Sequence, residues 1–95
     1  MKILITGGSS GLGKSLVEML SLERKNKIYF TYCNSISDAK KIEKKIDNVE
    51  KIHLDFSDEA SILKLVKKIP ELKCNVLINN AYSSYENLHF RKIDY

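Results

Sequence analysis

Short apolar runs alternate along this chain with longer segments whose apolar residues recur every three or four positions. The runs cover residues 2–6, 27–32, 51–55 and 75–79, and most of their side chains are apolar or β-branched. Such runs are typical of parallel strands that are buried on both faces of a sheet. The longer segments have the spacing of helices that bury one stripe. The pattern predicts an α/β fold in which strands alternate with helices and pair in parallel.

The three predicted helices each have an apolar stripe and a recognisable end. Ser37 and Ser57 are expected to cap the second and third helices, because a serine hydroxyl accepts a hydrogen bond from the first helical turn. Pro70 is expected to end the third helix, because proline has no N–H to donate. The residues expected on the inner stripes are Leu12, Leu16, Val17 and Leu20, then Ala39, Ile42 and Ile46, then Ile62, Leu63, Val66 and Ile69.

Length and composition indicate one globular domain. The 95 residues suffice for one buried core, and no linker divides them, so we expect residues 1–95 to form a single domain. The net charge of +4 is too small to indicate a nucleic-acid partner. No apolar run approaches the roughly 18 residues of a membrane span, so a cytoplasmic chain is the expectation. Cys33 and Cys74 stand too far apart to suggest a metal site or a redox pair.

All four glycines lie between positions 7 and 13, where the first strand meets the first helix. Glycine tolerates positive φ and lets backbone amides approach a bound group closely. The helix that follows contributes unpaired N–H groups and the positive end of its dipole. The segment therefore predicts an anion-binding loop, and phosphate is the most natural ligand.

One interpretation of this loop is an NTP-binding P-loop. The segment from Gly8 to Ser15, Gly-Ser-Ser-Gly-Leu-Gly-Lys-Ser, satisfies the pattern GxxxxGK[ST]. Lys14 would then reach the terminal phosphates and Ser15 would hold magnesium. Asp55, at the end of a later apolar run, is a possible acidic partner for the metal.

Three landmarks in chain order support a different interpretation. Thr6-Gly7-x-x-x-Gly11-x-Gly13 matches TGxxxGxG, the opening motif of the short-chain dehydrogenase/reductase family. Asp55-Phe56 follows the third strand, and Asn79-Asn80-Ala81 follows the fourth, where that family has an aspartate and the motif NNAG. The chain thus resembles the N-terminal half of this family. The resemblance implies a Rossmann-type doubly wound parallel sheet, truncated to about four strands in the order 3-2-1-4 with three helices.

The resemblance also implies a set of cofactor-binding residues along the chain. They are Gly7, Ser9, Ser10, Gly11, Leu12 and Gly13 at the pyrophosphate, Tyr32, Cys33, Asn34 and Ser35 at the adenosine ribose, Asp55 and Phe56 at the adenine, and Asn79, Asn80, Ala81 and Tyr82 toward the nicotinamide. Tyr82 replaces the usual glycine of NNAG. Its ring would narrow the approach to the nicotinamide or fold back over the loop.

Cofactor choice depends on the segment after the second strand. NAD-dependent relatives place a carboxylate there to hold the ribose 2′-hydroxyl. Residues 31–35 contain no acidic side chain, and Asn34 and Ser35 could donate hydrogen bonds to a 2′-phosphate. NADP(H) is therefore favoured over NAD(H), although Ser10 stands where NADP-dependent relatives often have a basic residue.

The family's catalytic pair does not occur among the 95 residues. Hydride transfer in this family uses Tyr-x-x-x-Lys, and none of the five tyrosines has a lysine four positions later. No catalytic residue is assigned, and we expect the chain to be a piece of a longer enzyme. The implied function is the NAD(P)(H)-binding portion of an oxidoreductase that acts on a small carbonyl or alcohol substrate and is homo-oligomeric at full length. A non-catalytic nucleotide-binding fragment or remnant and a P-loop NTPase are the alternatives.

The expected strand order leaves the fourth strand at an open edge. Its residues Val76, Leu77 and Ile78 have the composition of an interior strand. An apolar, unprotected edge invites pairing with another chain. On its own, the chain is expected to be marginally stable or to self-associate.

Overall fold

The computed structural model describes residues 1–9 and 11–80, which form a parallel sheet and three helices. The strands are β1 (Lys2–Thr6), β2 (Lys27–Tyr32), β3 (Val49–His53) and β4 (Val76–Asn79). The helices are α1 (Gly11–Leu20), α2 (Ile36–Lys45) and α3 (Glu59–Leu72). Strands and helices alternate along the chain as the hydrophobic pattern predicts.

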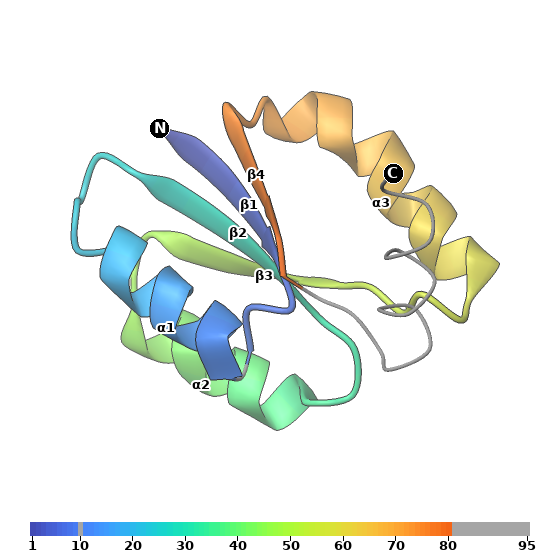
Figure 1. Cartoon of the computed structure of the whole chain (residues 1–95), viewed down its shortest axis with the longest axis horizontal. Helices are drawn as coiled ribbons and strands as arrows, with labels where there is room; N and C mark the ends of the chain where they lie inside the picture. The colour runs from blue at the N-terminus through green and yellow to red at the C-terminus, as the bar shows by residue number, and fades with distance from the viewer. Residues whose placement is uncertain (10, 81–95) are drawn as a thin grey trace, which may run out of the picture.

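The sheet has the order β3-β2-β1-β4, and all its neighbouring strands are parallel (Figure 1). Ile3 of β1 is the register partner of Ile28 in β2 and of Val76 in β4. The predicted fold class and strand order are therefore confirmed. Because the strands are parallel, their carboxyl ends meet at one edge of the sheet, where the predicted phosphate loop also lies.

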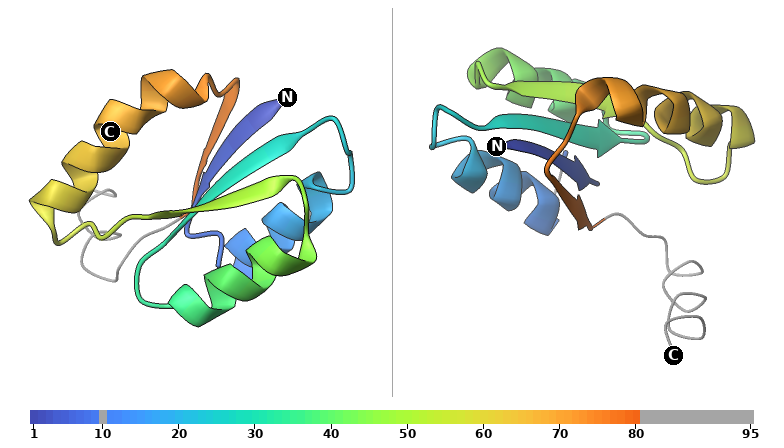
Figure 2. Two further views of the ribbon diagram at one scale, coloured as in Figure 1. Left: turned by 180° about the vertical axis from the view of Figure 1, so that it is seen from behind. Right: turned by 90° about the horizontal axis from the view of Figure 1, so that it is seen from above.

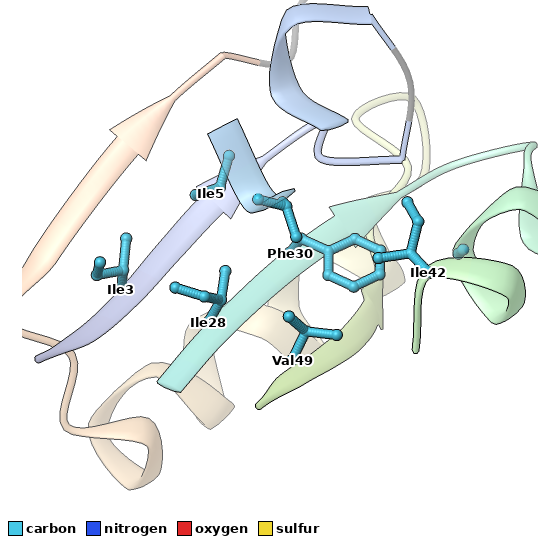
Figure 3. Packing of buried hydrophobic residues seen from close by; sticks show 8 residues of the cluster. Ile3, Ile5, Ile28, Phe30, Ile42 and Val49 are labelled. Carbon is cyan, nitrogen blue, oxygen red and sulfur yellow. The ribbon is translucent and has the colours of Figure 1, made fainter. Parts of the chain in front are cut away.

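Helices cover both faces of the sheet, with α1 and α2 on one side and α3 on the other (Figures 1 and 2). Side chains of β1 alternate between two cores, so that Ile3 and Ile5 belong to the first and Leu4 to the second. In the first core, the Phe30 ring lies toward Ile42 of α2 (Figure 3). The second core consists of Leu4, Ile52, Leu54, Leu65 and Leu72. Burial on both faces explains the continuous apolar runs of the strands.

Helix α3 buries a different stripe from the one predicted. Leu65 and Leu72 face the core, whereas Leu63, Val66 and Ile69 are 52%, 54% and 44% exposed. The helix has apolar residues on two neighbouring sides, and periodicity alone does not say which of the two the sheet covers.

The predicted ends of two helices also need correction. Pro70 does not end α3 but lies in its last turn, where it removes a single helical hydrogen bond. Asp58, rather than Ser57, caps α3 and accepts a hydrogen bond of 3.0 Å from the Ala60 amide. Ser37 lies within α2, whose N-cap residue is Ser35.

Helix α1 differs from expectation at its first turn, where the predicted inner residue Leu12 is 68% exposed. Val17 and Gly13 are its buried residues.

Among the residues that the structure describes, no helix is long and apolar enough to cross a membrane.

Candidate functional site

The glycine-rich loop connects β1 to α1 at the carboxyl edge of the sheet. Gly7 and Gly11 have φ values of 71° and 59°, in the left-handed region that favours glycine. A Cβ atom on Gly13 would lie 2.0 Å from the Gly7 carbonyl oxygen, and one on Gly8 would lie 2.5 Å from Phe30 Cβ. The loop conformation therefore requires glycine at these four positions, for two different physical reasons.

Side chains from the two neighbouring strands hold the loop in place. The Gly7 amide donates to Thr31 Oγ1 at 2.9 Å, and the Gly8 amide donates to the Thr31 carbonyl oxygen at 3.0 Å. On the other side of β1, Asn80 Nδ2 donates to the Gly7 carbonyl oxygen at 3.2 Å. The backbone of Gly7 is thus fixed from β2 and from the end of β4. Thr31 was not predicted as a site residue, because a buried threonine in a strand has no motif that marks it.

Thr6 connects the loop to the end of β4. Its hydroxyl donates to Asn79 Oδ1 and accepts from the Asn80 amide, with 2.8 Å for each bond. The two asparagines of the Asn-Asn-Ala motif therefore bind the Thr6 side chain and the backbone of Gly7. This contact explains why an asparagine pair accompanies a glycine-rich loop that lies more than 60 residues earlier in the chain.

The segment after β2 lies beside the same loop. The buried Ser9 hydroxyl is 2.8 Å from the Ser35 hydroxyl, and Ser35 makes no capping hydrogen bond with its side chain. Cys33 and Asn34 are exposed, and Tyr32 is half-buried with its ring centroid 5.4 Å from that of His53. The segment from Tyr32 to Ser35 thus forms one wall beside the predicted phosphate loop.

Asp55 and Phe56 follow β3 on the far side of β2. Asp55 Oδ1 accepts hydrogen bonds from the Ser57 hydroxyl at 2.7 Å and from the Ser57 amide at 2.9 Å. These bonds lower the pKa of the Asp55 carboxyl, and a bond with Cys33 contributes in the same direction. Asp55 is therefore ionised at neutral pH and touches the segment after β2. Phe56 is 41% exposed.

The structure thus brings the glycine loop, the segment after β2 and the end of β4 to one edge of the sheet. Ser10, Ala81 and Tyr82 were also predicted as site residues, but they lie outside the described residues. Lys14 and Leu12 are exposed on the first turn of α1. The Ser15 hydroxyl points back to the Gly11 carbonyl oxygen at 3.5 Å. The arrangement offers loop amides and a helix N-terminus to an anionic group.

Comparison with protein-family models gives a match to the short chain dehydrogenase model over residues 1–93. Comparison with the curated proteins gives no match. Solved structures do match. A short-chain dehydrogenase/reductase from Saccharomyces cerevisiae is 30% identical with a TM-score of 0.72, over 86% of this chain and 34% of that one.

Two bacterial structures have the same TM-score. A short-chain dehydrogenase/reductase from Serratia marcescens is 25% identical, with a TM-score of 0.72 over 86% of this chain and 36% of that one. An alternative dihydrofolate reductase from Brucella canis, complexed with NADP, is 24% identical with a TM-score of 0.72, over 86% of this chain and 34% of that one. The chain therefore spans about a third of the length of the solved structures that it matches.

Proposed function

Because the chain belongs to the short-chain dehydrogenase family, we propose that its residues form the dinucleotide-binding portion of an NAD(P)(H)-dependent oxidoreductase. The observation that supports this best is the close approach of Gly13 to the Gly7 carbonyl oxygen. It lets the start of α1 pack directly against the loop that follows β1, and this holds the helix N-terminus at the carboxyl edge of the sheet, where a phosphate would bind. On this proposal, residues 1–95 act as one domain of the enzyme.

The other predicted residues take their roles from their places at the carboxyl edge. We assign the loop amides around Gly11, Leu12 and Gly13 to the pyrophosphate. Residues 32–35 would lie against the adenosine ribose, and Asp55 and Phe56 against the adenine. Asn79 and Asn80 fix the loop and would lie on the path toward the nicotinamide, where Ala81 and Tyr82 follow in the sequence.

The 2′ position of the adenosine ribose would decide between the two dinucleotides. No carboxylate occurs at residues 31–35, so the repulsion that excludes a 2′-phosphate in NAD-dependent enzymes is missing there. The hydroxyls of Ser9 and Ser35 already lie within 2.8 Å of each other and could both turn to a phosphate. We therefore propose a preference for NADP(H) over NAD(H).

The proposed reaction is reversible hydride transfer between a carbonyl and an alcohol substrate. When bound, the nicotinamide supplies or accepts the hydride, and this chain's own residues bind and orient the dinucleotide. The 95 residues contain no Tyr-x-x-x-Lys, and we assign no proton-transferring group among them. For the full-length protein we propose a small carbonyl or alcohol substrate, a homo-oligomeric state and a cytoplasmic location. Without those groups, the chain would act as a nucleotide-binding module.

Ligand titration separates this proposal from the P-loop alternative. We expect NADPH to bind more tightly than NADH, and magnesium-ATP to bind weakly, as measured by calorimetry on the 95-residue chain. Gly13→Ala should weaken NADPH binding by at least tenfold, because its methyl group would collide with a backbone oxygen. The matched control is Lys14→Ala, because Lys14 is the next residue and is exposed. This variant should change the NADPH affinity less than twofold.

The opposite pattern would overturn the proposal. Tight binding of magnesium-ATP that is lost in Lys14→Ala would identify a P-loop, since that lysine has a defined role only with a triphosphate. Circular dichroism of each variant establishes that it is folded before its affinity is compared. If Gly13→Ala is unfolded, Ser9→Ala provides a milder change in the same loop and should reduce the preference for NADPH over NADH.

A further inference from the structure

Both backbone polar groups of Asp55 are bonded to the turn and the helix that follow β3. Its amide donates to the Ser61 hydroxyl at 2.8 Å, and its carbonyl oxygen accepts from the Asp58 amide at 3.0 Å. Ser61 is 5% exposed, so the first of these bonds ties Asp55 to the buried side of α3. The preceding residue, Leu54, donates its amide to the Tyr32 carbonyl oxygen at 2.9 Å. The backbone of Asp55 is therefore fixed relative to the ends of β2 and β3.

The carboxylate of Asp55 is oriented by Ser57. Ser57 donates to it from its hydroxyl at 2.7 Å and from its amide at 2.9 Å, and both bonds end on the same oxygen, Oδ1. These two bonds leave the second oxygen, Oδ2, to accept from another donor. Ser57 is exposed, whereas Ser61 is buried. The two serines thus have separate tasks, since Ser61 holds the backbone and Ser57 holds the side chain.

Asp55 borders the surface to which the dinucleotide is assigned. It comes after β3 at the carboxyl edge of the sheet, and its bond with Cys33 places it beside the wall formed by residues 32–35. Asp55 is half-buried, and the next residue, Phe56, is exposed. A carboxylate and an aromatic ring therefore follow each other where the proposed function places the adenine.

An ionised carboxylate restricts the groups that can bind to it, because it accepts hydrogen bonds and donates none. The hydroxyl and the amide of Ser57 are the main causes of the lowered pKa of Asp55, and Cys33 and His53 contribute in the same direction. The carboxyl is therefore ionised at neutral pH and favours a ligand with an N–H donor. Adenine presents its 6-amino group as such a donor, whereas hypoxanthine has a 6-oxo acceptor at the same place.

We propose that Ser57 is a positioning residue for the dinucleotide, because it holds the Asp55 carboxylate ready to accept from the 6-amino group of the adenine. This inference rests on the proposed function, in which Asp55 lies against the adenine. An acceptor that is already oriented loses less conformational entropy when the ligand binds. Its hydrogen bond is also stronger than one between neutral groups, because the acceptor is charged. Ser57 thereby favours adenine dinucleotides without touching the base.

Calorimetry with NADPH and with its hypoxanthine analogue, in which a 6-oxo group replaces the 6-amino group, tests this role. The wild-type chain should bind NADPH roughly fivefold more tightly than the analogue. Ser57→Ala should reduce the preference to less than about twofold, because the carboxylate loses the shorter of the two bonds that orient it. Ser57→Thr retains a hydroxyl at this position and should keep the wild-type preference.

Asp58→Ala controls for a purely structural effect at the start of α3. Asp58 is exposed, as Ser57 is, and its side chain accepts a hydrogen bond of 3.0 Å from the Ala60 amide. Its removal should lower the stability of the chain, because α3 loses its cap. The preference for NADPH over the hypoxanthine analogue should persist, since Asp55 keeps both bonds from Ser57. If Ser57 had only a structural role, the two alanine variants would behave alike.

The titration of Asp55 provides a second readout that needs no ligand. In Ser57→Ala, the pKa of the Asp55 carboxyl should rise toward its ordinary value, as followed by nuclear magnetic resonance of the carboxyl carbon. In Asp58→Ala, this pKa should not rise. The other titratable groups that act on Asp55 are Cys33 and His53, and both variants retain them.

The outcomes distinguish this inference from the proposed function. If NADPH binds but Ser57→Ala keeps the full preference over the hypoxanthine analogue, Ser57 is not a positioning residue and the proposed function is unaffected. A wild-type chain that binds both dinucleotides equally, or an Asp55 pKa that is the same in Ser57→Ala, would also overturn the inference. If NADPH does not bind to the wild-type chain, the proposed function fails, and the role of Ser57 fails with it.

Discussion

The carboxyl edge of the sheet and the β4 margin differ in how closely their residues are packed. The β4 margin consists of β4 and the exposed apolar side of α3, which carries Val66 and Ile69. At the carboxyl edge, Gly7 has hydrogen-bond partners on both sides, and Gly13 leaves no space for a methyl group. At the β4 margin, Leu77 and Val66 are more than half exposed. In the first region, the loop is held by hydrogen bonds from β2 and from the end of β4. The second leaves apolar side chains of β4 and α3 exposed. The two regions should therefore respond differently to substitution.

The largest effect is expected at Gly13. Gly13→Ala places a Cβ atom 2.0 Å from the Gly7 carbonyl oxygen, and the backbone of the loop has to move. We expect a loss of about 3 kcal/mol in the free energy of unfolding, measured by guanidinium denaturation. A change below about 0.5 kcal/mol would show that the loop adapts freely, contrary to the close packing inferred for it.

A smaller loss is expected at Thr31, which is 2% exposed and accepts the Gly7 amide hydrogen bond. Thr31→Val retains the shape but leaves the half-buried Gly7 N–H without its acceptor, which should cost about 1 kcal/mol in the free energy of unfolding. NADPH affinity should fall along with it. Thr31→Ser retains the hydroxyl and should preserve most of the affinity. Equal NADPH affinities for the valine and serine variants would show that the hydrogen bond between Gly7 and Thr31 does not contribute to binding.

Acidification should affect the carboxyl edge through Asp55. Its pKa is lower in the folded chain than its ordinary value, chiefly because of the Ser57 hydroxyl. The carboxylate therefore stabilises the fold above about pH 4, and this contribution is lost as the pH falls through the lowered pKa. The stability difference between the wild type and Asp55→Asn should accordingly shrink on acidification. A difference that grows toward acid pH would contradict the hydrogen bonds described for Asp55.

The smallest effect on stability is expected at the β4 margin. Val66→Lys should change the free energy of unfolding by less than about 0.5 kcal/mol, because the side chain is already more than half exposed. Leu65→Ala, at the neighbouring buried position, should cost about 3 kcal/mol by comparison. Thermal denaturation of the two variants and the wild type provides the test. A large loss in Val66→Lys would mean that this side of α3 is packed.

The same contrast explains what the sequence could predict. The parallel fold follows from apolar runs such as residues 2–6, because burial on both faces leaves a strong local pattern, and the strand order follows from the resemblance to the family. The glycine loop is equally visible, since positive φ and close contacts at Gly7 and Gly13 restrict the choice of residue. These features are determined by short stretches of chain, and the motif TGxxxGxG followed by Asn-Asn-Ala sufficed to identify the family.

Features that depend on distant packing were predicted less well. Helix α3 has two neighbouring apolar sides, and only the position of the sheet shows that Leu65 rather than Val66 is buried. Thr31 was missed because its importance comes from the loop that it meets 24 residues away. Asp58 competes with Ser57 as the helix cap, and Ser57 instead binds Asp55. For the α3 stripe and the α3 cap, the local sequence fits two residues equally well, and the tertiary contacts determine which of them is used.

Nuclear magnetic resonance of the isotopically labelled chain, titrated with NADPH, tests the central claim most directly. The claim is that the glycine loop binds the pyrophosphate of a dinucleotide. It predicts that the largest amide shifts fall on Gly11, Leu12 and Gly13, with further shifts from Tyr32 to Ser35. An unchanged loop in the presence of NADPH, together with strong shifts of Lys14 and Ser15 on addition of magnesium-ATP, would contradict it.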